Sequence, residues 1–167
     1  VYGDLDVSFI KGMPPGRHPV KTYVVGSHML QRIFRFMKKE MESGHQAYVV
    51  CPLVEQSEKQ DLAAAVSVYE NLRDHVFPQF GVGLVHGRMK NAEKEQVMED
   101  FRKGKFKLLV ATSVIEVGVN VPDATVMFVY GADRFGLSQL HQLRGRVGRG
   151  KEQAYCVLYT DNQNETT

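Results

Sequence analysis

The segment from Gln139 to Gly150, QLHQLRGRVGRG, contains the residue types best suited to chemistry. Gln139, Gln142, Arg146 and Arg149 are spaced three, four and three residues apart, which places them on one face of a helix. Arginine offers hydrogen-bond donors in a fixed fork and a charge that is never lost. The spacing therefore predicts a helix whose polar face binds the phosphates of a nucleotide.

The other residues of this segment would seat such a helix. Leu140, Leu143 and Val147 form a neighbouring apolar stripe, and Arg144 lies off the polar face, so we expect Arg144 to matter less. Glycines inside a helix cost about 1 kcal/mol each relative to alanine. The two glycines between Arg144 and Arg149 thus indicate close backbone approach or an early helix end. A merely solvated basic helix is the alternative, but it needs neither the glycines nor the glutamines.

Composition limits the class of protein. The 167 residues suffice for one domain with a full core, and 43% hydrophobic with 24% charged residues is typical of a soluble globular chain. The net charge is only +2. However, five Lys or Arg residues and one acid between Asp133 and Lys151 give a local charge of +4. The positive charge is therefore concentrated around the arginine segment.

Cysteine and histidine usage argues against a metal site. Cys51 and Cys156 each lie in an apolar run, as buried strand residues of a protein in a reducing compartment do, so we expect neither a disulfide nor a zinc site. The six histidines show no metal-ligand spacing. No apolar run is long enough for a membrane span or a signal peptide. We therefore expect no metal ligands, no membrane partner and a cytoplasmic location.

Short apolar runs alternate with helical patterns along the chain. Strands are expected at residues 20–25, 47–51, 82–85, 106–112, 124–130 and 154–159, and helices at residues 29–43, 61–76, 92–103 and from Ser138 onwards. Gly44 and Gly104 would end two of the helices as left-handed caps. This alternation predicts an α/β fold, a doubly wound and mostly parallel sheet with helices on both faces. Ligands of such sheets lie outside the carboxyl ends of the strands.

Two segments that follow predicted strands are candidates for phosphate contacts. In His86-Gly87-Arg88 the glycine permits close backbone approach, and the helix that follows offers free amides to an anion. Thr112 and Ser113 place two hydroxyls at a strand end, which suits a backbone phosphate of nucleic acid. Taken alone, each hydroxyl could simply cap a helix, and His86 could be a satisfied polar residue. We expect both segments at the same sheet edge as the arginine helix.

The sequence lacks the other half of a phosphoryl-transfer site. It contains no Gly-x-x-x-x-Gly-Lys-Ser/Thr loop and no acidic cluster after a strand that would hold magnesium. In-line phosphoryl transfer requires a phosphate cradle, a metal and a charge stabiliser, and only the stabiliser is encoded. We therefore expect a partner lobe to bind most of the ATP and Mg²⁺, and the isolated chain to have no ATPase activity.

These residues resemble a known family. Residues 112–122 and 139–150 resemble motifs V and VI of superfamily 2 helicases, and His86-Gly87 resembles motif IV. The resemblance implies the second RecA-like (P-loop NTPase-like) motor lobe of an ATP-dependent DNA helicase.

Longer stretches narrow the resemblance within the superfamily. Residues 134–149 are similar to a block shared by the RecG and Mfd families, whereas residues 3–7, 14–17 and 52–59 favour the RecG family. The resemblance then implies an inter-lobe linker at residues 1–18, the motor lobe at residues 19–161 and a tail at residues 162–167. Two alternatives stay open: a lobe of an Mfd-type transcription-repair coupling translocase, and a non-catalytic nucleic-acid-binding module.

The family also implies roles for nucleotide-site residues. Arg146 and Arg149 match the arginines that reach the γ-phosphate across the cleft between lobes, and Gln142 matches the residue that couples this site to the opposite lobe. Gly118 and Asn120 belong to the nucleotide-contacting part of motif V. Asn120 stands where the superfamily commonly has an aspartate on the ribose, so it keeps a carbonyl acceptor but loses the charge.

The remaining implications concern DNA and partners. Gly87, Arg88, Thr112 and Ser113 match segments that contact the DNA backbone. The implied partners are branched or forked double-stranded DNA and the first RecA-like lobe and wedge domain of the same polypeptide. The implied location is the bacterial cytosol, in association with the nucleoid.

Overall fold

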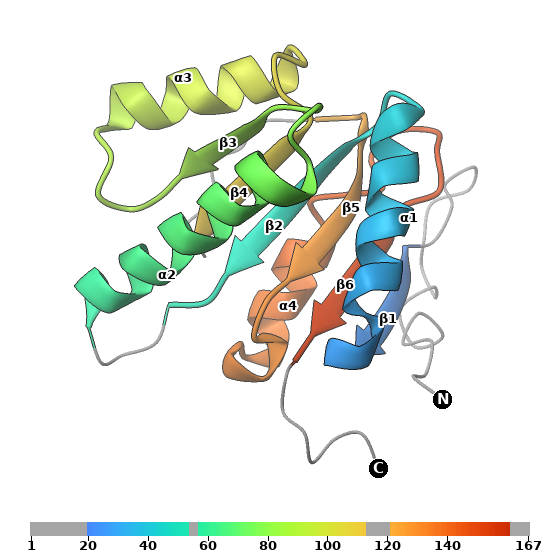
Figure 1. Ribbon diagram of the computed structural model, residues 1–167, viewed down its shortest axis with the longest axis horizontal. Helices are drawn as coiled ribbons and strands as arrows, with labels where there is room; N and C mark the ends of the chain where they lie inside the picture. The colour runs from blue at the N-terminus through green and yellow to red at the C-terminus, as the bar shows by residue number, and fades with distance from the viewer. Residues whose placement is uncertain (1–19, 54–56, 113–120, 161–167) are drawn as a thin grey trace.

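A single parallel sheet organises the described part of the chain. The computed structural model describes residues 20–53, 57–112 and 121–160, and these form a six-stranded sheet in the order β1-β6-β5-β2-β4-β3 (Figure 1). Every pair of neighbouring strands is parallel. The strands are β1 (Lys21–Val25), β2 (Gln46–Cys51), β3 (Val82–Val85), β4 (Leu108–Thr112), β5 (Ala124–Val129) and β6 (Tyr155–Tyr159).

The burial of each strand follows from its sequence. All residues of β2, β4 and β5 are buried, because a parallel sheet covered on both faces selects continuous apolar runs rather than alternation. The edge strands β1 and β3 include partly exposed residues. Apolar runs therefore located all six strands to within two residues at their starts.

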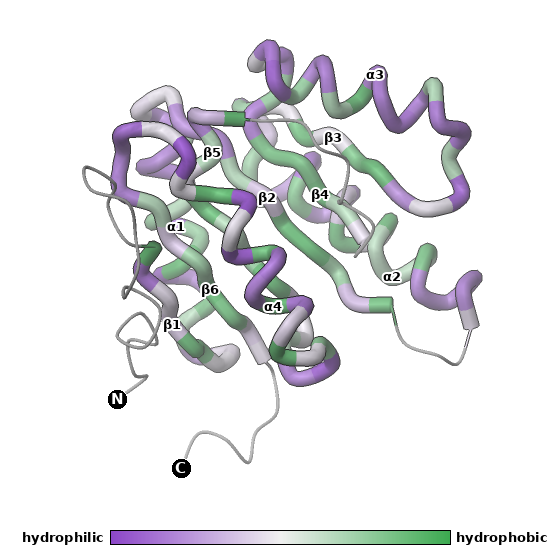
Figure 2. The backbone as a smooth tube through the Cα atoms, turned by 180° about the vertical axis from the view of Figure 1, so that it is seen from behind, coloured by the Kyte–Doolittle hydropathy of each residue, from purple (hydrophilic) through white to green (hydrophobic). Residues whose placement is uncertain are grey.

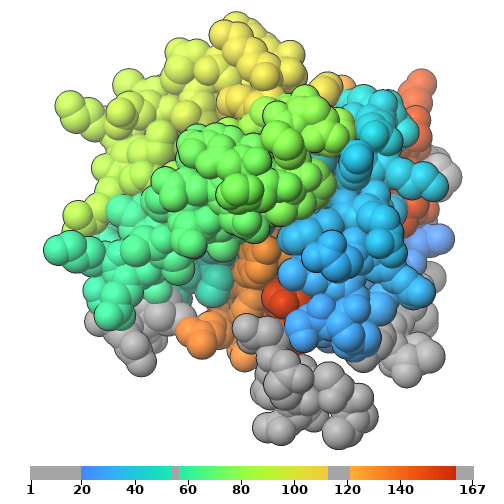
Figure 3. Space-filling view, in the orientation of Figure 1, coloured from blue at the N-terminus to red at the C-terminus, as the bar shows by residue number. Residues whose placement is uncertain are grey.

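Helices cover both faces of the sheet. Helix α1 (Leu30–Glu42) and helix α2 (Glu58–Asn71), which a π-helical turn extends to Val76, cover one face (Figure 3). Helix α3 (Asn91–Arg102) and helix α4 (Leu137–Arg144) cover the other (Figure 2). Met37 of α1 and Phe101 of α3 are fully buried on their respective faces. The predicted α/β fold, a parallel sheet with helices on both sides, is confirmed.

Glycines end two helices as predicted. Gly44 after α1 has φ 96°, and Gly104 after α3 has φ 84°, in the left-handed region that glycine tolerates. The Gly44 N–H donates to the Met41 carbonyl oxygen at 3.0 Å, and the Gly104 N–H donates to that of Phe101 at 2.9 Å. Each glycine therefore satisfies a helix carbonyl while it turns the chain toward the next strand.

The cysteines are buried strand residues, as their sequence context predicted. Cys51 and Cys156 are both buried, in β2 and β6 respectively. Burial raises the pKa of the Cys51 thiol to about 12, so this thiol stays protonated at neutral pH and is a poor nucleophile. No helix in the described ranges combines the length and apolarity needed to cross a bilayer.

Candidate functional site

Helix α4 is shorter than its sequence spacing predicts. It ends at Arg144, whereas the spacing predicted a helix as far as Gly150. The Gly145 N–H still donates to the His141 carbonyl oxygen at 3.0 Å, but Gly148 has φ 82° and cannot continue the helix. Both predicted explanations of the glycines are confirmed, because the helix ends early and a Cβ on Gly148 would come within 2.9 Å of Val20 Cγ2.

Arg146 and Arg149 consequently lie in a turn, residues 145–150, which we call the arginine turn. The prediction that they share one helical face with Gln139 and Gln142 is wrong, because those glutamines stay in α4. Gln139 has a local role instead, since its Oε1 accepts the Gly136 N–H at 2.8 Å and caps the start of α4. Gln142 is exposed on α4.

The two arginines of the turn act on the same buried phenol. Tyr48 of β2 is only 2% exposed, and burial raises its pKa to about 12, while the charges of Arg146 and Arg149 oppose that rise. Both arginine charges therefore act on a residue of the α3/α4 face of the sheet. Arg149 is exposed, and its Nε donates to the Gly145 carbonyl oxygen at 3.2 Å. This arrangement offers two permanent positive charges to phosphoryl oxygens.

The arginine turn lies at the amino edge of the sheet. A Cβ on Gly150 would come within 2.6 Å of the Pro122 carbonyl oxygen, and one on Gly148 within 2.9 Å of Val20 Cγ2. Val20 directly precedes β1, and Pro122 lies two residues before β5. Because α4 carries the chain back across the sheet, the residues after it reach the edge opposite to the strand ends (Figure 2). The expectation of one shared carboxyl edge is therefore wrong for the arginines.

The other two predicted segments do meet at the carboxyl edge. They surround a cavity of about 80 Å³ after β3 and β4, lined by Leu53, Glu58, Leu62, His86, Gly87, Arg88 and Thr112. The structure thus brings together Gly87, Arg88 and Thr112, three of the four residues predicted to contact DNA. We call this place the Arg88 cavity. The fourth residue, Ser113, lies outside the described residues, as do Gly118 and Asn120.

Two polar contacts shape the Arg88 cavity. His86 Nδ1 accepts the Arg88 backbone N–H at 3.2 Å, so His86 is a satisfied polar residue at a strand end. The Arg88 guanidinium pairs with Glu58 at the start of α2, with 3.2 Å between Nη2 and Oε1. The two side chains are 57% and 70% exposed, and such pairs contribute only about 0–1 kcal/mol. A phosphate can therefore replace Glu58 at little cost.

Thr112 carries an unsatisfied hydroxyl. The residue is 2% exposed, and its Oγ1 has no hydrogen-bond partner among the residues that the structure describes. Leaving a buried polar group unpaired costs about 1–3 kcal/mol, so such groups call for an explanation. The hydroxyl lines the same cavity as Arg88, where the sequence predicted a phosphate contact.

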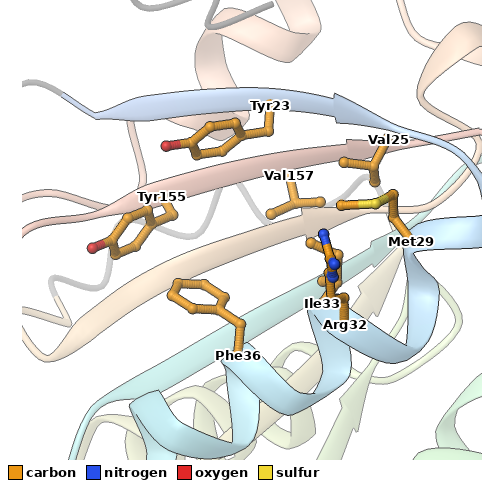
Figure 4. Close-up of a pocket in the computed structure, with 8 residues that line it drawn as sticks. All are labelled: Tyr23, Val25, Met29, Arg32, Ile33, Phe36, Tyr155 and Val157. Atoms are coloured by element: carbon orange, nitrogen blue, oxygen red, sulfur yellow. The ribbon is translucent and has the colours of Figure 1, made fainter. Parts of the chain in front are cut away.

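A larger cavity than the Arg88 cavity lies away from both regions. It measures about 570 Å³, and Figure 4 shows α1, β1 and β6 contributing its mostly apolar lining, which includes Tyr23, Phe36 and Tyr155. This is the α1/α2 face, opposite the arginine turn. Within residues 20–53, 57–112 and 121–160, no three His, Cys, Asp or Glu side chains come together in a way that could hold a metal ion. Neither Arg146 nor Arg149 lines this cavity.

Comparison with known proteins identifies the family of the chain. Residues 27–151 match the helicase conserved C-terminal domain. The chain is 52% identical over 166 residues to the ATP-dependent DNA helicase RecG of Bacillus subtilis (strain 168), covering 99% of the chain and 24% of that protein. It is 49% identical over 164 residues to RecG of Thermotoga maritima, covering 98% and 21%. The chain thus spans about a quarter of the length of the curated relatives that it matches.

Solved structures agree with these sequence similarities. A structure of RecG bound to a three-way DNA junction superposes with a TM-score of 0.76 at 44% identity, covering 92% of this chain and 20% of that one. Yeast Dbp5 bound to RNA and ADP BeF3 gives a TM-score of 0.59 at 16% identity, covering 86% and 35%, and supports the fold alone. The predicted resemblance to RecG-type helicases and the RecA-like fold are confirmed.

Proposed function

Because the chain belongs to the family of helicase conserved C-terminal domains, we propose that it is the second motor lobe of an ATP-dependent DNA helicase. The whole protein would remodel stalled replication forks and branch-migrate junctions in recombination and repair. Support comes from 52% identity to a RecG helicase across nearly the whole chain and from the structural likeness to RecG on a DNA junction.

One observation carries the catalytic part of this proposal: Arg146 and Arg149 both lie in the short arginine turn, and the positive charges of both lower the pKa of the same tyrosine, Tyr48. Guanidinium groups supplied across a cleft stabilise the charge that develops as the γ-phosphoryl group passes to water. The first lobe of the same polypeptide would hold most of the ATP and Mg²⁺, and this chain would add the two charges. Gln142, exposed on the adjoining helix, would couple the nucleotide to the opposite lobe, and Gly118 and Asn120 would contact the nucleotide.

The Arg88 cavity would bind the DNA backbone. Gly87, Arg88 and Thr112 converge there, and Ser113 follows directly in the sequence. Phosphate contacts of this kind fix position along a duplex without reading its sequence. The fork itself would be recognised by a wedge domain elsewhere in the polypeptide. A function on chromosomal DNA implies the bacterial cytosol, in association with the nucleoid.

Removal of Arg149 in the full-length protein tests the proposal. Arg149→Ala should abolish DNA-stimulated ATP hydrolysis and leave fork binding nearly intact, because an arginine finger is worth roughly 10³–10⁵ in rate. Arg149→Lys should fail almost as badly, since an ammonium lacks the planar fork. Steady-state hydrolysis and fork-binding titrations measure the two effects.

Arg102→Ala is the matched control, since Arg102 is an exposed arginine on α3 that pairs with Glu99. It should leave hydrolysis unchanged. If Arg149→Ala instead loses fork binding in proportion to hydrolysis, the arginine turn is a DNA contact and the assignment of its role is wrong.

A further inference from the structure

The last residue of α4 makes two long-range hydrogen bonds. Arg144 Nε donates to Thr22 Oγ1 at 2.8 Å, and its Nη2 donates to the Val20 carbonyl oxygen at 2.5 Å. Thr22 and Val20 are 2% and 5% exposed, so these bonds are sheltered from water. Arg144 therefore joins the end of α4 to the beginning of β1. Spacing alone suggested that Arg144 matters less than Arg149, and the structure gives Arg144 an anchoring role.

The arginine turn rests on the same part of β1 at a second point. A Cβ on Gly148 would come within 2.9 Å of Val20 Cγ2 and 3.5 Å of Ala154 Cβ, so only glycine allows this approach. The Lys21 N–H donates to the Ala154 carbonyl oxygen at 3.0 Å, which holds β1 against the chain that enters β6. The turn is thus held on both sides of Arg146, through the Val20 carbonyl at Arg144 and the Val20 side chain at Gly148.

Arginine is the residue type that the contact between the end of α4 and the start of β1 requires. Its planar group holds several donors in one fixed geometry, so it can reach a hydroxyl and a carbonyl at the same time, which an ammonium on a flexible stem does poorly. A positive charge at the last position of a helix also interacts favourably with the partial negative charge of the helix end.

We propose that Arg144 is a positioning residue for ATP hydrolysis, which fastens the arginine turn to the start of β1 so that Arg146 and Arg149 meet the transferring phosphate. This inference rests on the proposed function of those two arginines. The proposed inter-lobe linker, residues 1–18, precedes Val20 in the sequence. Displacement of reacting groups by about 1 Å can lower the rate 10²-fold. The hydrogen bonds of Arg144 can therefore affect the rate of hydrolysis by holding the arginine turn in place.

Two matched threonine substitutions distinguish positioning of the arginine turn from simple stabilisation of the lobe. Thr22→Val removes the acceptor of Arg144 Nε and leaves Arg144 itself in place. Thr125→Val removes a comparable bond on the other face of the sheet, where Thr125 Oγ1 donates to Glu40 Oε1 at 2.8 Å. Both threonines are 2% exposed, so the two substitutions lose equally sheltered hydroxyls.

The measurements are kcat and KM for DNA-stimulated ATP hydrolysis by the full-length protein, together with fork binding and thermal denaturation. Arg144→Gln should lower kcat by about tenfold or more, in line with a displaced catalytic group, and leave KM for ATP and fork binding nearly unchanged. Thr22→Val should lower kcat in the same direction by a smaller factor, and Arg144→Lys should restore part of the loss. Thr125→Val should leave kcat unchanged.

If Thr22→Val and Thr125→Val lower the melting temperature alike and both keep the parent kcat, Arg144 only stabilises the lobe and the inference is overturned. Arg149→Ala, measured in parallel, keeps the two proposals apart. Loss of hydrolysis with Arg149→Ala but full kcat with Arg144→Gln refutes the positioning role alone, whereas full hydrolysis with Arg149→Ala refutes the proposed function.

Discussion

The arginine turn and the Arg88 cavity hold their cationic groups in opposite ways. The turn is seated by glycines that pack against Pro122 and Val20, and by an arginine whose hydrogen bonds are sheltered. Arg88, in contrast, is held by one carboxylate, Glu58, and both side chains are more than half exposed. The arginine turn is therefore held by buried contacts. Arg88 is held by an exposed ion pair, in which another anion can take the place of Glu58.

The difference matches the two tasks proposed for these regions. A group that stabilises a transition state must already be in place when the charge develops, because reorganisation during the reaction would be added to the barrier. A group that follows a DNA backbone must release one phosphate and take the next. Rigid packing suits the first task, and a weak surface pair suits the second.

After the loss expected for Arg149→Ala, the next largest effect should come from crowding the turn. A methyl group on Gly150 would meet the Pro122 carbonyl oxygen at 2.6 Å, a backbone atom that cannot swing aside. Gly150→Ala should therefore shift the arginine turn and lower kcat for DNA-stimulated hydrolysis by about 10²-fold in the full-length protein, with fork binding largely kept. Steady-state kinetics measure this loss.

Gly136→Ala is the control, because a methyl group there would lie 3.7 Å from its nearest neighbour, Gln139 Oε1. It should change kcat little. Equal kinetics for the two glycine variants would mean that the turn tolerates movement, and the contrast with the Arg88 cavity would disappear.

A smaller effect should follow from removing the exchangeable cation. Arg88→Ala should weaken fork binding by the full-length protein several-fold and reduce the slope of log affinity against log salt by about 0.9, the contribution of one phosphate on duplex DNA. Glu58→Gln should strengthen fork binding and increase the slope, because it frees Arg88 from its carboxylate partner. Binding titrations at several salt concentrations give both slopes.

Arg102→Ala again serves as the control, as an exposed arginine with a carboxylate partner on α3. It should leave the slope unchanged. An Arg88→Ala variant with the parent slope would show that Arg88 neutralises no phosphate.

The smallest effect concerns the unpaired hydroxyl at the end of β4. Thr112→Val keeps the shape of the side chain and removes the buried Oγ1, so the 167-residue chain should become more stable by about 1 kcal/mol in urea denaturation. DNA-stimulated hydrolysis by the full-length variant should nevertheless fall. Lower stability would indicate that Oγ1 is satisfied, and unchanged hydrolysis would exclude it as a DNA contact.

Much of the fold was predictable because it depends on local sequence. Strand β2 was predicted at residues 47–51 and spans Gln46–Cys51, because a parallel strand that is buried on both faces has a nearly continuous apolar sequence. Gly44 and Gly104 cap helices as predicted because a left-handed position selects glycine. Each of these features is specified within a few residues of the chain.

The rest depends on contacts between distant segments. The prediction that the arginines share a helical face assumed that α4 continues to Gly150. Two glycines in the sequence are compatible both with a helix that continues and with a helix that ends at Arg144. Glu58 lies 30 residues from Arg88, and Arg144 lies 122 residues from Thr22, so neither pair leaves a signal in a single sequence. The rule that ligands gather at the carboxyl ends of strands describes residues that follow strands, and the arginine turn follows a helix.

The strand order has a consequence for biosynthesis. In the described sheet, β1 is an edge strand whose neighbour is β6, and Lys21 is paired with Tyr155, 134 residues later (155 minus 21). At about 5–20 residues per second, the ribosome needs roughly 7–27 s to deliver that partner after β1 has been made. Arg144 and Gly148 also rest on the start of β1. The arginine turn therefore reaches its final position only when the last strand of the sheet has been synthesised and paired.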